Sequence, residues 1–193
     1  LGSQGKEECW LILDAKPGAA IAAGFKQSVD SETLRAAALD GSIEEMLDWH
    51  PVKRGDFFYI PANTVHAIGG GVSLLEVQQN SDITYRLFDY GRPRELHLEK
   101  GMSVAKGEPF PETCRTHIPE TFCGRLVDGP YFTLDRIVGI PDVATIELRT
   151  SSFLAIPVTE AITVRGTRIK AGECALATTL DDIEFDQGGT CYL

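Results

Sequence analysis

One histidine of this 193-residue sequence follows closely on a short apolar segment that a proline brings to an end. The segment is Gly55-Asp56-Phe57-Phe58-Tyr59-Ile60-Pro61-Ala62-Asn63-Thr64-Val65-His66. Its order predicts a glycine turn, a short strand, a proline stop and a tight turn that ends at His66. Such a turn can deliver an imidazole into the mouth of a small β-barrel, where it could bind a metal ion. Taken alone, His66 could equally be a buried, hydrogen-bonded histidine.

Two further segments carry side chains suited to acid–base chemistry and to anion binding. In Leu74-Leu75-Glu76-Val77-Gln78, strand alternation places Glu76 and Gln78 on one face. If the intervening apolar residues pack under other strands, Glu76 points into the barrel. The same alternation in a strand over 83–90 directs Arg86 to one face, where its guanidinium could hold an oxyanion or a phosphate in bidentate fashion. Glu76 could instead be a structural partner of Arg86.

The segments that must position these side chains are predicted to be mainly strands. In the first half we expect strands at Cys9–Asp14, Ala19–Phe25, Phe57–Ile60, Val72–Gln79 and Ile83–Tyr90. Between them, residues 28–49 show helical spacing, and Ser42 with Glu45 predicts a capping box. The glycine- and proline-rich segment Lys106–Pro111 is the best linker candidate, so we expect one domain over 1–107 and another over 108–193.

The second half is also predicted to be β structure, without helices. Short strands are expected at Phe132–Val138, Ala144–Arg149, Ser152–Ile156, Ala161–Val164, Thr167–Lys170 and Cys174–Ala177. The segment Thr167–Thr178 repeats the glycine-then-strand order found around Gly55, but no histidine follows it. We therefore expect a second domain of the same type that holds no metal.

The composition is that of a globular protein with an acidic balance. Lys and Arg number 18 against 28 Asp and Glu, a net charge of −10, with 43% hydrophobic residues. This excludes a disordered, collagen-like or coiled-coil chain, and it argues against nucleic acid or an anionic membrane as partner. The five cysteines are scattered, with no Cys-x-x-Cys pair, and no apolar stretch approaches the roughly 20 residues of a membrane span. We therefore expect buried, reduced cysteines and a cytoplasmic protein.

Four motifs, taken in order, closely resemble the bacterial type I mannose-6-phosphate isomerases of the cupin superfamily. They are Gly5 to Trp10, with its Lys-x-Glu; Pro51 to Pro61; Thr64 to Gly69, with the histidine of the second cupin motif; and Leu75 to Arg86. The resemblance is close over residues 5–92 and looser beyond. It implies a cupin jelly-roll barrel with a small helical insertion, followed by a degenerate cupin-like domain.

The resemblance also implies an activity and the residues that perform it. The family interconverts mannose 6-phosphate and fructose 6-phosphate through a cis-enediol, with one zinc ion per chain. Carried over, Glu8 and His66 are metal ligands, Arg86 and Lys6 have catalytic or substrate-binding roles, and Glu76 is a further catalytic candidate. A shift in register would make Glu7 the ligand, although alternation sends it to the opposite face. Lys6 could also be a solvated lysine.

One family feature is missing from this sequence. The family's Gln-x-His motif, which supplies two more zinc ligands upstream of Lys-x-Glu, does not occur. The sequence begins at Leu1 rather than Met, so we expect a chain that lacks its N-terminal segment. The alternative is a non-catalytic sugar-phosphate-binding cupin that has lost part of its metal site. His97 and His117 are poor substitutes as ligands, and His50 is expected to be solvated at a helix end. The oligomeric state stays open.

Overall fold

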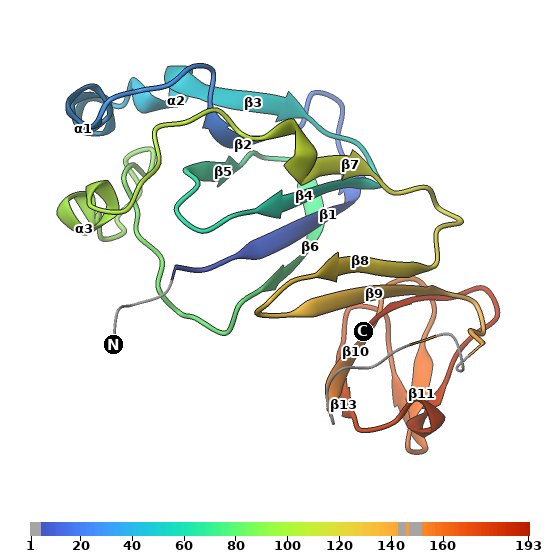
Figure 1. Ribbon diagram of the computed structural model, residues 1–193. Coiled ribbons are helices and arrows are strands. Elements are labelled where there is room, and N and C mark those ends of the chain that lie inside the picture. The colour runs from blue at the N-terminus through green and yellow to red at the C-terminus, as the bar shows by residue number, and fades with distance from the viewer. Residues whose placement is uncertain (1–4, 143–145, 147–151) are drawn as a thin grey trace. The chain divides into compact units, whose positions relative to one another are not determined.

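Two units make up the protein, and each has its own sheets and its own core. The computed structural model describes residues 5–142, 146 and 152–193. The chain divides into Leu1–Ile118 and Pro119–Leu193 (Figure 1). The division falls after Ile118 because the strand at Arg115–His117 pairs within the first unit. The regular structure of the described residues is mainly strand, as the sequence predicts.

The first unit contains two antiparallel sheets. One has the order β6-β1-β4-β7 and the other has the order β3-β2-β5. The strands are β1 (Glu8–Ala15), β2 (Ala20–Phe25), β3 (Leu47–Pro51), β4 (Asp56–Ile60), β5 (His66–Ile68), β6 (Val72–Gln78) and β7 (Arg115–His117). This arrangement places the segment that contains Glu8 and the one that contains His66 in different sheets.

The register of β1 decides which of its side chains enter the core. Glu8 pairs with Ile60 and Trp10 pairs with Phe58, so these four side chains share one face of the sheet. Trp10, Phe58 and Ile60 are buried in a core that also takes Ile12. Glu8 is only 2% exposed although it is charged. Burial of a carboxylate is costly unless it is paired, which marks this position as one with a special role.

The helical insertion predicted for residues 28–49 is present as α1 (Ser31–Asp40) and α2 (Ile43–Met46). Asp30 caps α1 by accepting a hydrogen bond from the Thr33 amide at 2.9 Å. The predicted capping box is wrong, because the Ser42 hydroxyl bonds to Asp40 instead of to the first turn of α2. The insertion also ends earlier than predicted, since β3 begins at Leu47.

Two further predictions for the first unit are wrong. Residues 83–90, predicted as a strand, have no regular structure, and the alternation argued for Arg86 therefore does not apply. Helix is also found outside 28–49, because α3 (Leu98–Met102) and the 3-10 turn η1 (Glu112–Cys114) follow this segment. The irregular segment nevertheless packs against α3. Leu87 lies so close to Gly101 of this helix that a Cβ atom added to the glycine would be 2.6 Å from the Leu87 side chain.

The second unit is β structure with one 3-10 turn, η3 (Leu180–Asp182), in its described part. Its sheets have the orders β13-β10-β15-β9-β8 and β12-β11-β14. The strands are β8 (Gly124–Asp128), β9 (Thr133–Val138), β10 (Phe153–Pro157), β11 (Ile162–Val164), β12 (Thr167–Ile169), β13 (Ala175–Ala177), β14 (Ile183–Glu184) and β15 (Thr190–Tyr192). The strand predicted at 144–149 lies outside the described residues, except for residue 146. Ile137 and Ala155 lie at the centre of this unit's core.

Candidate metal and sugar-phosphate site

Glu8 and His66 meet inside the first unit although 57 residues lie between them in the sequence. The His66 Nε2 atom lies 3.1 Å from Glu8 Oε1. The other ring nitrogen, Nδ1, lies 2.8 Å from the carbonyl oxygen of Thr64. A carbonyl oxygen can only accept, so Nδ1 carries the proton in this contact and Nε2 presents its lone pair to Glu8 when the ring is neutral. The edge-on packing of the ring against Trp10 further fixes its orientation.

This geometry brings two hydrogen-bond acceptors face to face. A neutral His66 Nε2 and a carboxylate oxygen repel each other at 3.1 Å unless a proton or a cation lies between them. Carboxylate oxygen and imidazole nitrogen are both zinc donors, at about 2.0–2.2 Å from the metal, which leaves two ligands roughly 3–3.5 Å apart. The donor types and their separation therefore fit zinc. In number they fall short, because no cluster of three or more His, Cys, Asp or Glu is found among residues 5–142, 146 and 152–193.

Lys6 lies on the other side of the Glu8 carboxylate. Its Nζ atom is 3.2 Å from Glu8 Oε2 and donates a hydrogen bond of 2.7 Å to Gln78 Oε1. Lys6 Nζ is close enough to Glu8 Oε2 for an ion pair, but the contact does not have the geometry of a hydrogen bond. Among the described residues, this buried oxygen therefore has no hydrogen-bond donor. Lys6 thus compensates the charge of Glu8 and cannot be an isolated solvated lysine. Glu7 lies apart from this group, since the Tyr59 hydroxyl donates to its carboxylate.

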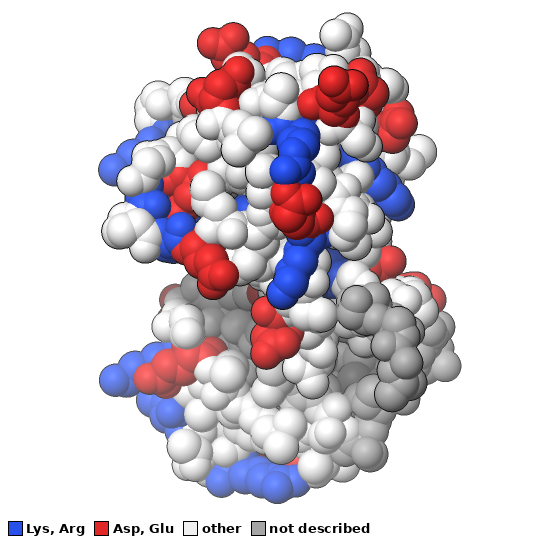
Figure 2. All heavy atoms as spheres, turned by 90° about the vertical axis from the view of Figure 1, so that its left-hand side faces the viewer, with Lys and Arg blue, Asp and Glu red and all other residues white. Residues whose placement is uncertain are grey.

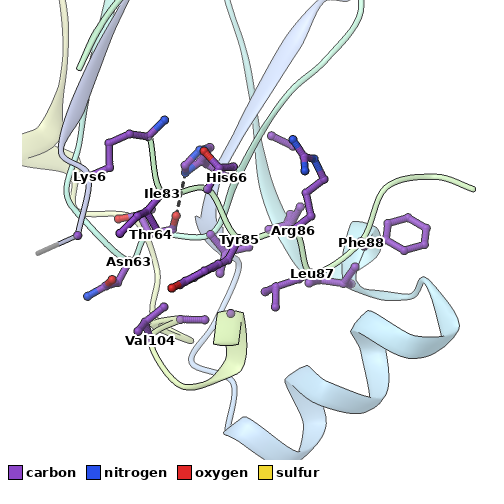
Figure 3. Close-up of a pocket in the computed structure, with 18 of the residues that line it drawn as sticks. Lys6, Asn63, Thr64, His66, Ile83, Tyr85, Arg86, Leu87, Phe88 and Val104 are labelled. Atoms are coloured by element: carbon purple, nitrogen blue, oxygen red, sulfur yellow. Dashed lines mark hydrogen bonds between the residues drawn. The ribbon is translucent and has the colours of Figure 1, made fainter. Parts of the chain in front are cut away.

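A cavity of about 340 Å³ opens beside these groups. Lys6, His66 and Arg86 line it from three separate segments, and Figure 3 shows their side chains together with those of Asn63 and Tyr85 around the space. Irregular segments, rather than strands, supply much of the wall: residues 63–65 come from the turn before β5, and residues 83–88 contribute consecutively. A continuous stretch of side chains can line one cavity only because this segment is not a strand.

Arg86 is a cation of this cavity. Neither an ion pair nor a side-chain hydrogen bond of its guanidinium is found in the described part of the chain. The nearby Asp89 is buried, and two other arginines contact its carboxylate. Arg94 Nε donates a hydrogen bond of 2.6 Å to Asp89 Oδ2, and Arg92 Nη2 lies 2.7 Å from Asp89 Oδ1. The hydrogen bond from Arg94 lowers the pKa of Asp89 below its usual value, and the charge of Arg86 is one of several that add to this effect, so this carboxylate stays charged and occupied. The Arg86 guanidinium is therefore available for an anionic ligand.

Glu76 lies on the same face of the sheet as Glu8 but is not part of the cavity wall. It pairs across the strands with Trp10, while Gln78 pairs with Glu8. Partial loss of hydration and then the charge of Glu8 raise the pKa of Glu76, and the positive charges of Lys6 and His66 oppose this shift. Glu76 thus shares the face of Glu8, as strand alternation predicts, but it is exposed and outside the cavity wall, so the expectation that it points into the barrel is not confirmed.

The other three histidines have structural contacts. The His117 ring pairs with Asp56 at 2.9 Å in the exposed part of β7. His50, predicted to be solvated, is buried in β3, where it accepts a hydrogen bond of 3.1 Å from Arg115 and packs against Phe58. His97 accepts a hydrogen bond from the Arg86 amide. None of them takes part in the group formed by Glu8 and His66.

Two contributors to the site were not identified from the sequence. Thr64 orients His66 through its backbone carbonyl oxygen. Every residue type has this atom, so the sequence does not indicate the contact. Asn63 adopts a left-handed conformation with φ of 73° and lines the cavity. An asparagine between a proline stop and a histidine is a usable signal, because asparagine tolerates this conformation better than most residues.

The surface of the molecule carries mixed charges. On the face shown in Figure 2, Lys and Arg side chains lie next to Asp and Glu side chains rather than in a separate basic patch. Arg35 and Glu99 form one ion pair of the first unit. No helix in the described ranges has the length and apolar character to cross a lipid bilayer.

Of the five cysteines, all of which are free, Cys9 and Cys191 are buried as expected. Burial raises the pKa of each of these two thiols to about 12. Cys114 is half-buried, and Cys123 and Cys174 are exposed, so the prediction of buried cysteines is wrong for the last two.

Comparison with known proteins identifies related enzymes. No family model matches the chain. The mannose-6-phosphate isomerase ManA of Bacillus subtilis is 41% identical over 144 residues, which are 70% of this chain and 45% of that protein. The mannose-6-phosphate isomerase of Streptococcus mutans is 41% identical over 143 residues, 69% of this chain and 44% of that protein. The matched region thus spans less than half the length of these curated relatives.

Solved structures agree with the sequence matches. The crystal structure of the mannose 6-phosphate isomerase from Bacillus subtilis superposes with a TM-score of 0.76 at 29% identity, covering 99% of this chain and 65% of that one. A zinc-bound mannose 6-phosphate isomerase superposes with a TM-score of 0.62 at 15% identity, covering 97% and 65% of the two chains, which supports the fold alone. Over the part of those proteins that it spans, the chain is similar in sequence and in fold to mannose-6-phosphate isomerases.

Proposed function

We propose that this protein interconverts mannose 6-phosphate and fructose 6-phosphate and that Glu8 and His66 bind a zinc ion for this reaction. The observation that carries the proposal is the 3.1 Å approach of His66 Nε2 to Glu8 Oε1 beside a cavity that holds the Arg86 guanidinium. Relatives at 41% identity named for this activity support it. Because the match covers less than half of each relative, the activity of the whole protein is part of the proposal.

Each proposed role follows from a position in the structure. When bound, a zinc ion supplies positive charge for the hydroxyl and carbonyl oxygens of the sugar. Glu8 and His66 would hold it, and its other coordination positions would be filled by water, sugar oxygens or groups outside the described residues. Arg86 would bind the phosphate or the oxyanion of the sugar with its guanidinium. Lys6 would compensate the charge of Glu8 and offer a donor at the cavity edge.

The reaction also needs a group that moves a proton between C1 and C2 through the cis-enediol. Glu76 is the candidate among the site residues, because its raised pKa brings proton uptake closer to neutral pH, where a general base works best. Its side chain lies on the sheet face that contains Glu8, but it is exposed and outside the cavity wall, so in this role the sugar would have to extend from the cavity to the surface of β6.

A second candidate function is a non-catalytic sugar-phosphate-binding protein. The observation in its favour is that residues 5–142, 146 and 152–193 provide two zinc donors at this site rather than three or four. The arginine would still hold the phosphate in such a protein. The two candidates therefore agree on binding and differ only in zinc and turnover.

The test is conversion of mannose 6-phosphate by the zinc-loaded protein, before and after treatment with a chelator. We expect formation of fructose 6-phosphate, incorporation of solvent deuterium at the carbon that is protonated, and loss of both on chelation. Binding of mannose 6-phosphate without conversion would overturn the isomerase proposal in favour of the binding protein. A small sugar phosphate is the partner in either case, and a cytoplasmic location goes with the proposal.

A further inference from the structure

The backbone of Arg86 is held by a single residue, His97, from both sides. The Arg86 amide donates a hydrogen bond of 3.2 Å to His97 Nδ1, and the His97 amide donates one of 2.8 Å to the Arg86 carbonyl oxygen. The two residues thus form a closed ring of hydrogen bonds across ten intervening positions. Arg86 lies in neither a strand nor a helix, so these two bonds pair the backbone amide and carbonyl that secondary structure would otherwise pair.

His97 is itself attached to a helix. It is the residue that precedes α3, and its carbonyl oxygen accepts a hydrogen bond of 2.7 Å from the Gly101 amide. Its ring lies 6.0 Å from the Tyr85 ring, and 22% of its side chain is exposed. Next to Arg86, Leu87 packs so closely on Gly101 that an added Cβ would lie 2.6 Å from it. The segment that carries Arg86 is therefore pinned to α3 at two adjacent residues.

We propose that His97 is a positioning residue that fixes the backbone of Arg86, and with it the start of the side chain that enters the cavity, by accepting the hydrogen bond of the Arg86 amide at Nδ1. For its consequence in turnover, the inference rests on the isomerase function proposed above. The bond requires Nδ1 to be unprotonated, so Nε2 carries the ring proton and faces Glu95 Oε2 at 3.7 Å. His97 does not touch the ligand in this role. It lowers the entropy that Arg86 loses when it binds an anion.

The test separates the acceptor at Nδ1 from the volume of the ring. His97→Phe keeps the ring and removes the acceptor, whereas His97→Asn places an amide oxygen close to the position of Nδ1. His117→Phe is the matched control, because His117 lies in β7 outside the cavity wall. The measurements are calorimetric titration with inorganic phosphate, hydrogen–deuterium exchange of the Arg86 amide, and the kinetic constants with mannose 6-phosphate.

We expect His97→Phe to weaken phosphate binding by about three- to tenfold and to speed exchange of the Arg86 amide, with KM affected more than kcat. His97→Asn should restore most of both, and His117→Phe should leave both unchanged. Parent-like phosphate binding and amide exchange in His97→Phe would overturn the inference while leaving the isomerase proposal intact. Absence of turnover in the parent protein, with the effect of His97→Phe on phosphate binding preserved, would overturn the isomerase proposal alone. If Arg86→Ala binds phosphate as the parent does, both fall.

Discussion

The contact between His66 and Glu8 places strong limits on the charge state of both residues. The Thr64 carbonyl fixes the ring proton on Nδ1, so Nε2 can face the Glu8 carboxylate only as a protonated donor or as a ligand to a shared cation. A proton and a zinc ion therefore compete for one position.

Replacement of His66 tests the metal assignment directly. We expect His66→Ala to lose zinc during desalting, because one oxygen donor remains at the site. Arg86→Ala should retain zinc at the parent level. The Arg86 guanidinium lines the cavity but is not a proposed zinc ligand, and it would bind the negative charge of the substrate. Zinc content is measured by atomic spectroscopy after gel filtration. Zinc retained by His66→Ala, or lost by Arg86→Ala, would contradict the assignment.

The role of Glu76 has a signature in the pH dependence of turnover. Its pKa is raised, so the carboxyl stays protonated to a higher pH than an ordinary glutamate and becomes a base only above that point. We expect kcat to fall on the acid side, with a midpoint above the usual glutamate range. Glu76→Gln should remove this limb and lower kcat by about 10²–10⁴-fold.

The control for Glu76 is Glu7→Gln, which removes the same charge from the residue that lies beside Tyr59. It should keep the acid limb of the pH profile. A profile of Glu76→Gln that parallels that of the parent protein would show that another group moves the proton.

The site residues differ in how far the sequence could predict them. Glu8 and His66 stand in motifs that resemble those of a known family, and that resemblance, rather than the local geometry of either segment, implied that they meet. The part played by Thr64 and the pairing of His97 with Arg86 could not be predicted in this way, because both involve backbone atoms that every residue type possesses. Lys6 was left open because its partner, Gln78, lies 72 positions away.

At the scale of elements, the longer apolar strands β1 and β2 were predictable from the sequence, whereas the short strands β3, β5 and β7 were missed. Residues 83–90 have β-forming side chains, yet they form an irregular segment in which His97 pairs with the backbone amide and carbonyl of Arg86. β propensity measures how well a side chain fits a pleated surface and cannot tell whether a partner strand is present. The helix α3 was missed because five residues are too few to show a helical period.

Close approach of backbones at Gly24 is a feature of β2 that a substitution can test. Gly24 has φ of 66°, and a Cβ there would lie 2.5 Å from the Phe110 amide nitrogen. We expect Gly24→Ala to lower the free energy of unfolding by about 1–2 kcal/mol, because alanine is strained in the left-handed conformation. The cost of moving the backbone at Phe110 adds to this loss. Gly18→Ala, with φ of 80° and no atom within 4 Å of the added Cβ, should show the strain alone. Urea unfolding compares the two, and equal losses would contradict the argument.

At the scale of the whole molecule, each of the two units has its own buried core. The first contains Ile12 and the second contains Ile137, each of which is 1% exposed. The sequence contains two tryptophans, Trp10 and Trp49, and both lie in the first unit. Tryptophan fluorescence therefore reports on the first unit, whereas far-ultraviolet circular dichroism reports on the strands of both.

This difference in probes allows the two cores to be tested separately. Ile12→Ala and Ile137→Ala each remove the same buried atoms, at a cost of about 2–5 kcal/mol to the unit concerned. Because each unit packs its own core, we expect Ile12→Ala to lower the midpoint of the fluorescence transition in urea. Ile137→Ala should leave that midpoint in place and shift only part of the circular dichroism signal. If Ile137→Ala moves the fluorescence transition as far as Ile12→Ala does, the two cores unfold as one cooperative body, and damage to the second unit would also disrupt the site that contains Glu8 and His66.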